Sequence, residues 1–210
     1  MQKLLLVAAI VLVCSSMAFA TPEYELIVGS NSTGWITGPV PTSYFGWTGI
    51  TATGISNSPD AGFPGALDLG TFTATDSTST QTLDVLFSDT GFTTPAGGFS
   101  LGYSVHTIIG TGPSSASGWW DNTDTLGAET NPIGTITFPT GVGTSTVTAG
   151  GTVVSPYSLT IEEAFSPTTA VAFSADGSII ATPEPTSIVL FGTILSLAGF
   201  AFRRKLKKNS

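Results

Sequence analysis

Apolar and polar residues alternate with a period of two over several stretches between residues 82 and 173. In the longest stretch, residues 99–109, every second position carries Phe, Leu, Tyr, Val, Thr or Ile, and the first four positions between them carry Ser, Gly, Ser and His. Successive side chains of a strand point to opposite faces, so the pattern predicts β-strands with one buried face. The same alternation occurs in residues 82–88, 157–162 and 171–173.

Turn-forming residues separate these apolar runs, as in Ser58-Pro59-Asp60, Gly112-Pro113-Ser114 and Asp176-Gly177. Residues 21–181 are rich in Ser, Thr and Gly, a composition also found in disordered mucin-like stalks. The regular alternation favours an ordered domain instead, and no segment of it has a convincing helical period. We therefore predict an all-β fold of eight to ten short strands, an antiparallel β-sandwich of jelly-roll or Ig-like type.

The N-terminal 20 residues have the three parts of a secretory signal peptide. Lys3 supplies positive charge, residues 4–13 form an uncharged apolar core, and Ala18 and Ala20 give the small-x-small pattern that signal peptidase accepts. Ten apolar residues are too few to span about 30 Å of hydrocarbon. The segment 1–20 is therefore predicted to be removed after Ala20.

The C-terminal residues 182–209 have a second membrane signature. The tripeptide Pro183-Glu184-Pro185 precedes an uncharged segment, residues 186–202, and a basic tail, residues 203–208. Seventeen residues make a short single transmembrane helix, and the basic tail places its C-terminal end in the cytoplasm. The two prolines resist helix formation and keep the tripeptide extended outside that helix.

This order of tripeptide, apolar segment and basic tail resembles the PEP-CTERM sorting domain of Gram-negative bacteria. The resemblance implies processing by a membrane-embedded exosortase, after transient anchoring in the inner membrane, and delivery to the cell surface or the extracellular space. Proteins of this kind usually occur in species that make exopolysaccharide. The residues that match the sorting signal are Pro183, Glu184, Pro185, Arg203, Arg204 and Lys205.

The charge of the chain is distributed very unevenly. All six Lys and Arg residues lie at residue 3 or within residues 203–208, and 13 of the 14 acidic residues lie between residues 21 and 182. A body with 13 negative charges and no positive side chain repels phosphate backbones. Nucleic acids are therefore excluded as partners.

Residues for catalysis are scarce. The chain has one histidine, His106, and one cysteine, Cys14, which falls inside the predicted signal peptide. A nucleophile needs an adjacent base held by a third group, and one histidine offers few arrangements of that kind. Glu162 and Glu163 are neighbours on a predicted strand and so point to opposite faces, which prevents them from sharing a substrate. We predict that the protein is not an enzyme.

A candidate ligand site lies in residues 119–125. Asp121 and Asp124 supply the oxygen ligands that Ca²⁺ prefers, although the spacing departs from an EF-hand. Trp119 or Trp120 offers an aromatic face for stacking on a sugar ring. The alternative interpretation is a tryptophan in the core beside a solvated acidic loop.

The sequence thus predicts an exported, non-enzymatic cell-surface or extracellular-matrix protein, cleaved at its C-terminal signal by an exosortase. The alternative is a carbohydrate-binding or Ca²⁺-dependent adhesive module that acts on exopolysaccharide. The expected partners are signal peptidase, exosortase, the membrane before processing, and extracellular polysaccharide.

Overall fold

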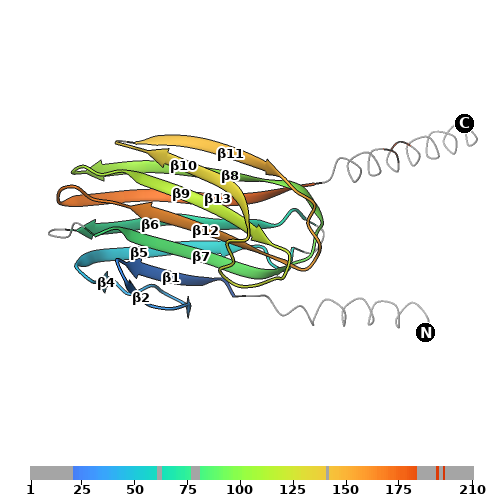
Figure 1. The fold of residues 1–210 in the computed structure, drawn as a ribbon, viewed down its shortest axis with the longest axis horizontal. Coiled ribbons are helices and arrows are strands. Elements are labelled where there is room, and N and C mark those ends of the chain that lie inside the picture. Colours follow the sequence, from blue (N-terminus) through green and yellow to red (C-terminus); the bar gives the residue numbers. More distant parts are fainter. Residues whose placement is uncertain are drawn as a thin grey trace, which may run out of the picture.

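Two antiparallel β-sheets make up the body of the protein (Figure 1). The computed structural model describes residues 21–60, 63–76, 81–140 and 142–183, together with residues 193 and 196. Sheet A has the strand order β10-β9-β12-β7-β1-β2, with β3 also paired to β1, and sheet B has the order β11-β8-β13-β6-β5-β4. The strands are β1 (Glu23–Val28), β2 (Asn31–Ser32), β3 (Ile36–Thr37), β4 (Ser43–Tyr44), β5 (Trp47–Ser56), β6 (Ala66–Asp76), β7 (Leu83–Phe92), β8 (Ala96–Ile109), β9 (Ser114–Asp121), β10 (Asn131–Phe138), β11 (Gly143–Gly150), β12 (Tyr157–Phe165) and β13 (Val171–Pro183).

The eight strands from β6 to β13 have jelly-roll connectivity. Four of them form the order β7-β12-β9-β10 in sheet A, and the other four form the order β6-β13-β8-β11 in sheet B. In this arrangement the first and last strands of the motif pair with each other, and the chain crosses repeatedly between the sheets. The predicted antiparallel sandwich is confirmed, with the jelly-roll order rather than the Ig-like one.

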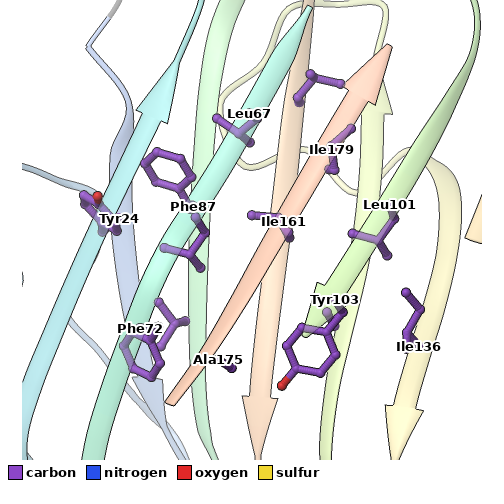
Figure 2. Close-up of a cluster of buried hydrophobic side chains, with 14 of the residues drawn as sticks. Tyr24, Leu67, Phe72, Phe87, Leu101, Tyr103, Ile136, Ile161, Ala175 and Ile179 are labelled. Atoms are coloured by element: carbon purple, nitrogen blue, oxygen red, sulfur yellow. The ribbon is translucent and has the colours of Figure 1, made fainter. Parts of the chain in front are cut away.

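The core lies between the two sheets and consists of the apolar residues of the alternating runs. Leu101 and Tyr103 from sheet B and Ile161 from sheet A lie close together in the core (Figure 2), each at most 1% exposed. Phe99 stacks on Trp120, with ring centroids 5.0 Å apart, and also contacts Tyr157 edge-on at 5.9 Å. Burial of this apolar surface is the main stabilising contribution in a domain without disulfides.

The simple alternation fails at two places. Beyond Val105 in β8 the register shifts, so Ile109 is 67% exposed instead of buried. In β7, Leu86 and Ser88 were expected on the solvent face, yet both are buried. The loop after β9 covers that part of sheet A, because the backbone N–H of Gly127 donates to Ser88 Oγ at 2.9 Å.

Strand β1 begins and strand β13 ends at the same end of the sandwich (Figure 1). The predicted signal peptide, with Ala18 and Ala20, lies outside the described residues. Most of the predicted sorting signal also lies outside the described residues. This applies to Glu184, Pro185, Arg203, Arg204, Lys205 and all of the predicted span 186–202 except residues 193 and 196. No helix long and apolar enough to cross a membrane occurs among the residues that the structure describes.

Candidate functional site

The side chains of segment 119–125 mainly stabilise the fold. Trp120 is 8% exposed, and its ring packs on Phe99 in the core. Trp119 is half-buried, at the neighbouring position of the strand. Trp120 therefore presents little of its aromatic face to a ligand, because its ring already packs on Phe99. Of the two tryptophans, Trp119 is the more exposed.

The two aspartates of this segment hold the loop in place. Asp121 is 2% exposed, and its Oδ2 accepts hydrogen bonds from the backbone N–H groups of Thr123 at 3.0 Å and Thr125 at 3.2 Å. Asp124 has a φ of 55°, and its Oδ1 accepts from the N–H of Gly91 at 2.7 Å. These contacts give both carboxylates a structural role at the ends of β7 and β9. Among the described residues, no group of three or more His, Cys, Asp or Glu side chains is placed to hold a metal ion.

A groove on the outer face of sheet B is a better candidate for ligand binding. Its cavity volume is about 410 Å³, within the range of small-ligand sites. Four neighbouring strands contribute to it, and almost every side chain that lines it is polar or glycine. The lining residues are Asp68, Gly70, Thr71, Gly102, Tyr103, Ser104, Thr144, Ser145, Thr146, Asp176, Gly177 and Ser178.

Two β-bulges meet at this groove, one on each side of Asp176. On β6, Gly70 and Thr71 lie between the partners of Gly177 and Ala175, so two residues face the single residue Asp176. On β8, His106 is the extra residue between the partners of Ala175 and Ser174. Bulges bend a sheet and redirect side chains, and they are over-represented beside binding sites. Their alignment here explains why the outer face of sheet B is hollowed at Asp176.

The groove contains two acidic side chains, Asp68 and Asp176. Asp176 Oδ2 is hydrogen-bonded to His106 Nε2 beside the groove, and the side chains of His106 and Asp176 are 52% and 38% exposed. Burial, and secondarily the charge of Asp176, raises the pKa of Asp68. The other carboxylate oxygen of Asp176, Oδ1, is buried and accepts no hydrogen bond from the part of the chain described. A buried acceptor without a partner raises the free energy of the folded state.

Glu163 lies directly beneath the floor of the groove. It is fully buried, and neither of its carboxyl oxygens has a hydrogen-bond partner among the described residues. Gly177 makes room for it, because a Cβ at position 177 would lie 2.7 Å from Glu163 Oε1 and 2.6 Å from Ile161 Cδ1. Burial, and then the charges of Asp176 and Asp68, hold the pKa of Glu163 well above its ordinary value.

Glu162 and Glu163 occupy opposite faces of β12, as the strand period predicted. Glu163 is in the core, whereas Glu162 is half-buried on the other face of sheet A. Burial, with the charges of Asp84 and Glu129, raises the pKa of Glu162 to about 7. The two carboxyl groups are therefore separated by the sheet and do not form a catalytic pair.

The structure corrects one element of the sequence interpretation at this site. Asp176-Gly177 has the composition of a turn, but it lies in the middle of the continuous strand β13. Its glycine serves close packing against Ile161 and Glu163 rather than a change of chain direction. The sequence does not reveal Asp68 and Glu163 as neighbours of Asp176, because the three residues come from different strands. The order of sheet B brings Asp68 near Asp176, and the packing of sheet A on sheet B brings Glu163 beneath them.

Comparison with known proteins identifies the C-terminal segment. The family model described as the PEP-CTERM protein-sorting motif matches residues 181–205. The chain therefore carries a PEP-CTERM protein-sorting motif, which indicates an exported protein that is processed at the membrane. No curated protein matches the sequence.

Several solved structures resemble this chain only distantly. The carbohydrate-binding module TmCBM61 in complex with β-1,4-galactotriose is 10% identical with a TM-score of 0.32, over 64% of this chain and 88% of that chain. The enzymatically active domain of bacteriophage CBA120 tailspike protein 4 is 15% identical with a TM-score of 0.35, over 74% of this chain and 19% of that chain. The N-terminal cellulose-binding domain of Cellulomonas fimi β-1,4-glucanase C is 15% identical with a TM-score of 0.33, over 55% of this chain and 80% of that chain. Similarities this low do not transfer a ligand or an activity.

Proposed function

We propose that this protein is a non-enzymatic component of the cell surface or extracellular matrix, delivered by exosortase cleavage at Pro183-Glu184-Pro185. The observation that carries the proposal is the sorting motif at residues 181–205, which begins where the last strand of the sandwich ends. Before cleavage, residues 186–202 anchor the chain in the inner membrane, and Arg203, Arg204 and Lys205 stay in the cytoplasm. The single histidine, already paired with Asp176, is consistent with a body that has no catalytic role.

Replacing Pro183, Glu184 and Pro185 together by alanine should abolish this processing. Wild-type protein recovered from the medium or surface of its own host is expected to lack the basic tail, whereas the triple variant should stay in the membrane at full length. Intact-mass spectrometry of both fractions measures the difference. Pro139→Ala, in an exposed turn after β10, is the control and should be processed like the wild type. Retention of the basic tail in wild type and variant alike would identify an ordinary single-pass anchor.

A second candidate function is binding of extracellular polysaccharide by the body. The groove on sheet B favours it, because carboxylate, hydroxyl and backbone groups there match the donors and acceptors of sugar hydroxyls. Asp68 and Asp176 are the main acceptors, and Ser104, Thr144 and Ser178 can both donate and accept. The body has no Lys or Arg, so uncharged polysaccharides are favoured over anionic ones. This proposal places the sugar site in the groove rather than at residues 119–124, and it involves no Ca²⁺.

Asp176→Asn is expected to weaken binding of an uncharged polysaccharide by about 10- to 100-fold, since hydrogen bonds to charged groups contribute about 1.5–3 kcal/mol. The affinities of the wild type and of Asp176→Asn are measured by affinity electrophoresis of the purified proteins. The gels contain dextran, galactan or xyloglucan, and a gel with alginate provides the anionic comparison. Thr148→Ala, exposed on β11 and outside the groove, is the matched control. Equal retardation of the wild type and Asp176→Asn in every gel would refute a sugar site in the groove.

A further inference from the structure

The first three residues of the sorting motif belong to the folded body. In the pairing of β13 with β8, Ala181 faces Phe99, Thr182 faces Gly98 and Pro183 faces Ala96. The backbone N–H of Ala181 also donates to the carbonyl of Gly65 at 2.8 Å. The matched family segment starts at residue 181, so it overlaps the end of β13 by three residues.

This overlap lies in an interior strand of sheet B. Strand β13 runs between β8 and β6, and Ile179 and Ala181 near its end are at most 2% exposed. A protease needs several residues of its substrate unpaired and accessible, so cleavage inside a paired strand requires local unfolding. Bonds before Pro183 are therefore protected for as long as the sandwich is folded.

We infer that the folded sandwich sets the upstream limit of processing, so that the mature protein keeps every residue through Pro183. This inference rests on the proposed cleavage of the sorting signal. Hydrolysis there breaks one peptide C–N bond, adds the hydroxyl of water to the carbonyl carbon, and leaves the proton on the released amine. The new carboxylate then belongs to Pro183 or to a residue beyond it.

The distance to the predicted membrane segment is short. Glu184 and Pro185 alone separate Pro183 from residue 186, and three residue steps reach at most about 10 Å. The protease must therefore act in the narrow interval between the end of β13 and the apolar segment. The end of the sandwich is thus part of what the protease encounters.

Gly98 allows this protection to be loosened selectively. A Cβ at position 98 would lie 2.7 Å from the carbonyl oxygen of Ala149 on β11 and 3.2 Å from Thr182 Oγ1 on β13. Gly98→Ala therefore displaces β8 from β11 and disturbs its pairing with the end of β13. Gly150 faces Gly98 across the β8–β11 pair, and a Cβ there would meet nothing within 4 Å. Gly150→Ala is therefore a matched control.

Two measurements test the inference. In the host, intact mass of the mature protein should show a C-terminus at Pro183 or later. In vitro, the full-length chain in detergent is treated with elastase, which cleaves after small apolar residues such as Ala181. Cleavage after Ile180 and Ala181 should be at least tenfold faster in Gly98→Ala than in the wild type, and unchanged in Gly150→Ala.

The outcomes separate this inference from the proposed function. A mature protein that ends at or before Thr182 would overturn the inference and leave exosortase processing intact. Rapid elastase cleavage after Ala181 in the folded wild type, as fast as in Gly98→Ala, would also overturn it. Elastase protection without any processing in the host would reject the proposed function, and with it the mature C-terminus inferred here.

Discussion

Replacing Glu163 with methionine is expected to stabilise the protein at pH 7 by about 1–3 kcal/mol, the usual cost of an unsatisfied buried polar group. Glu163 is fully buried with no hydrogen-bond partner among the described residues, and methionine fills nearly the same volume with apolar atoms. In a chain of this size the gain corresponds to an increase in Tm of several degrees. Chemical denaturation of the full-length chain in detergent measures it.

The same residue makes stability depend on pH in an unusual direction. Because its pKa is raised in the folded state, the native protein binds more protons than the unfolded chain at pH values between the ordinary glutamate pKa and this raised pKa. Over that range the free energy of unfolding falls as the pH rises, by about 1.4 kcal/mol per pH unit for one such group. Glu162, with its pKa raised to about 7, adds to this effect between about pH 4.3 and neutrality.

Two variants isolate the contribution of Glu163. Glu163→Met and Glu163→Gln should both reduce the loss of stability between pH 5 and pH 8, because neither side chain titrates. Only Glu163→Met should also remove the unsatisfied polar atoms, so it should be the more stable of the two. A wild-type protein whose unfolding midpoint rises from pH 5 to pH 8 would contradict the assignment.

Phe99→Ala is expected to destabilise the protein by about 3–5 kcal/mol, the usual range for deleting a buried aromatic ring. Phe99 is 1% exposed, and it joins the two sheets through its contacts with Trp120 and Tyr157. The variant opens a cavity and removes the stacking partner of Trp120, so its Tm should fall by about 10 °C. Thermal unfolding followed by near-ultraviolet circular dichroism reports both changes.

Phe63→Ala is the matched control for this prediction. Phe63 is 71% exposed in the loop before β6, so the same chemical change should alter the free energy of unfolding by about 0.5 kcal/mol or less. Equal effects of the two substitutions would mean that Phe99 does not hold the sheets together.

The sandwich could be predicted from the sequence because its signal is local. The alternation at residues 99–105 depends only on which neighbouring side chains face the core, and the structure buries Phe99, Leu101, Tyr103 and Val105 as expected. The prediction fails at Ile109 because the bulge at His106 changes the phase of the strand. A bulge is specified by the partner strands as well as by its own sequence, so a period of two cannot reveal it.

The groove could not be predicted in the same way. Its two acidic residues, Asp68 and Asp176, and His106, which is hydrogen-bonded to Asp176, come from three strands that are distant in sequence and adjacent only in the jelly-roll order. Asp176-Gly177 was misleading because a glycine for close packing and a glycine for a turn have the same local sequence. The sorting signal, in contrast, is a contiguous motif, and the sequence alone was sufficient to find it.

The place of β13 in sheet B also fixes the order of events during export. It is the last strand of the described part of the chain, yet it lies between β6 and β8, which are left with open edges until it arrives. A chain that crosses the membrane N-terminus first releases residues 171–183 only after every other strand, and the sorting signal follows at once. On the proposed processing route, completion of the sheet and arrival of the signal at the membrane therefore coincide in time, and a chain truncated before β13 would lack both a complete sheet B and the sorting signal.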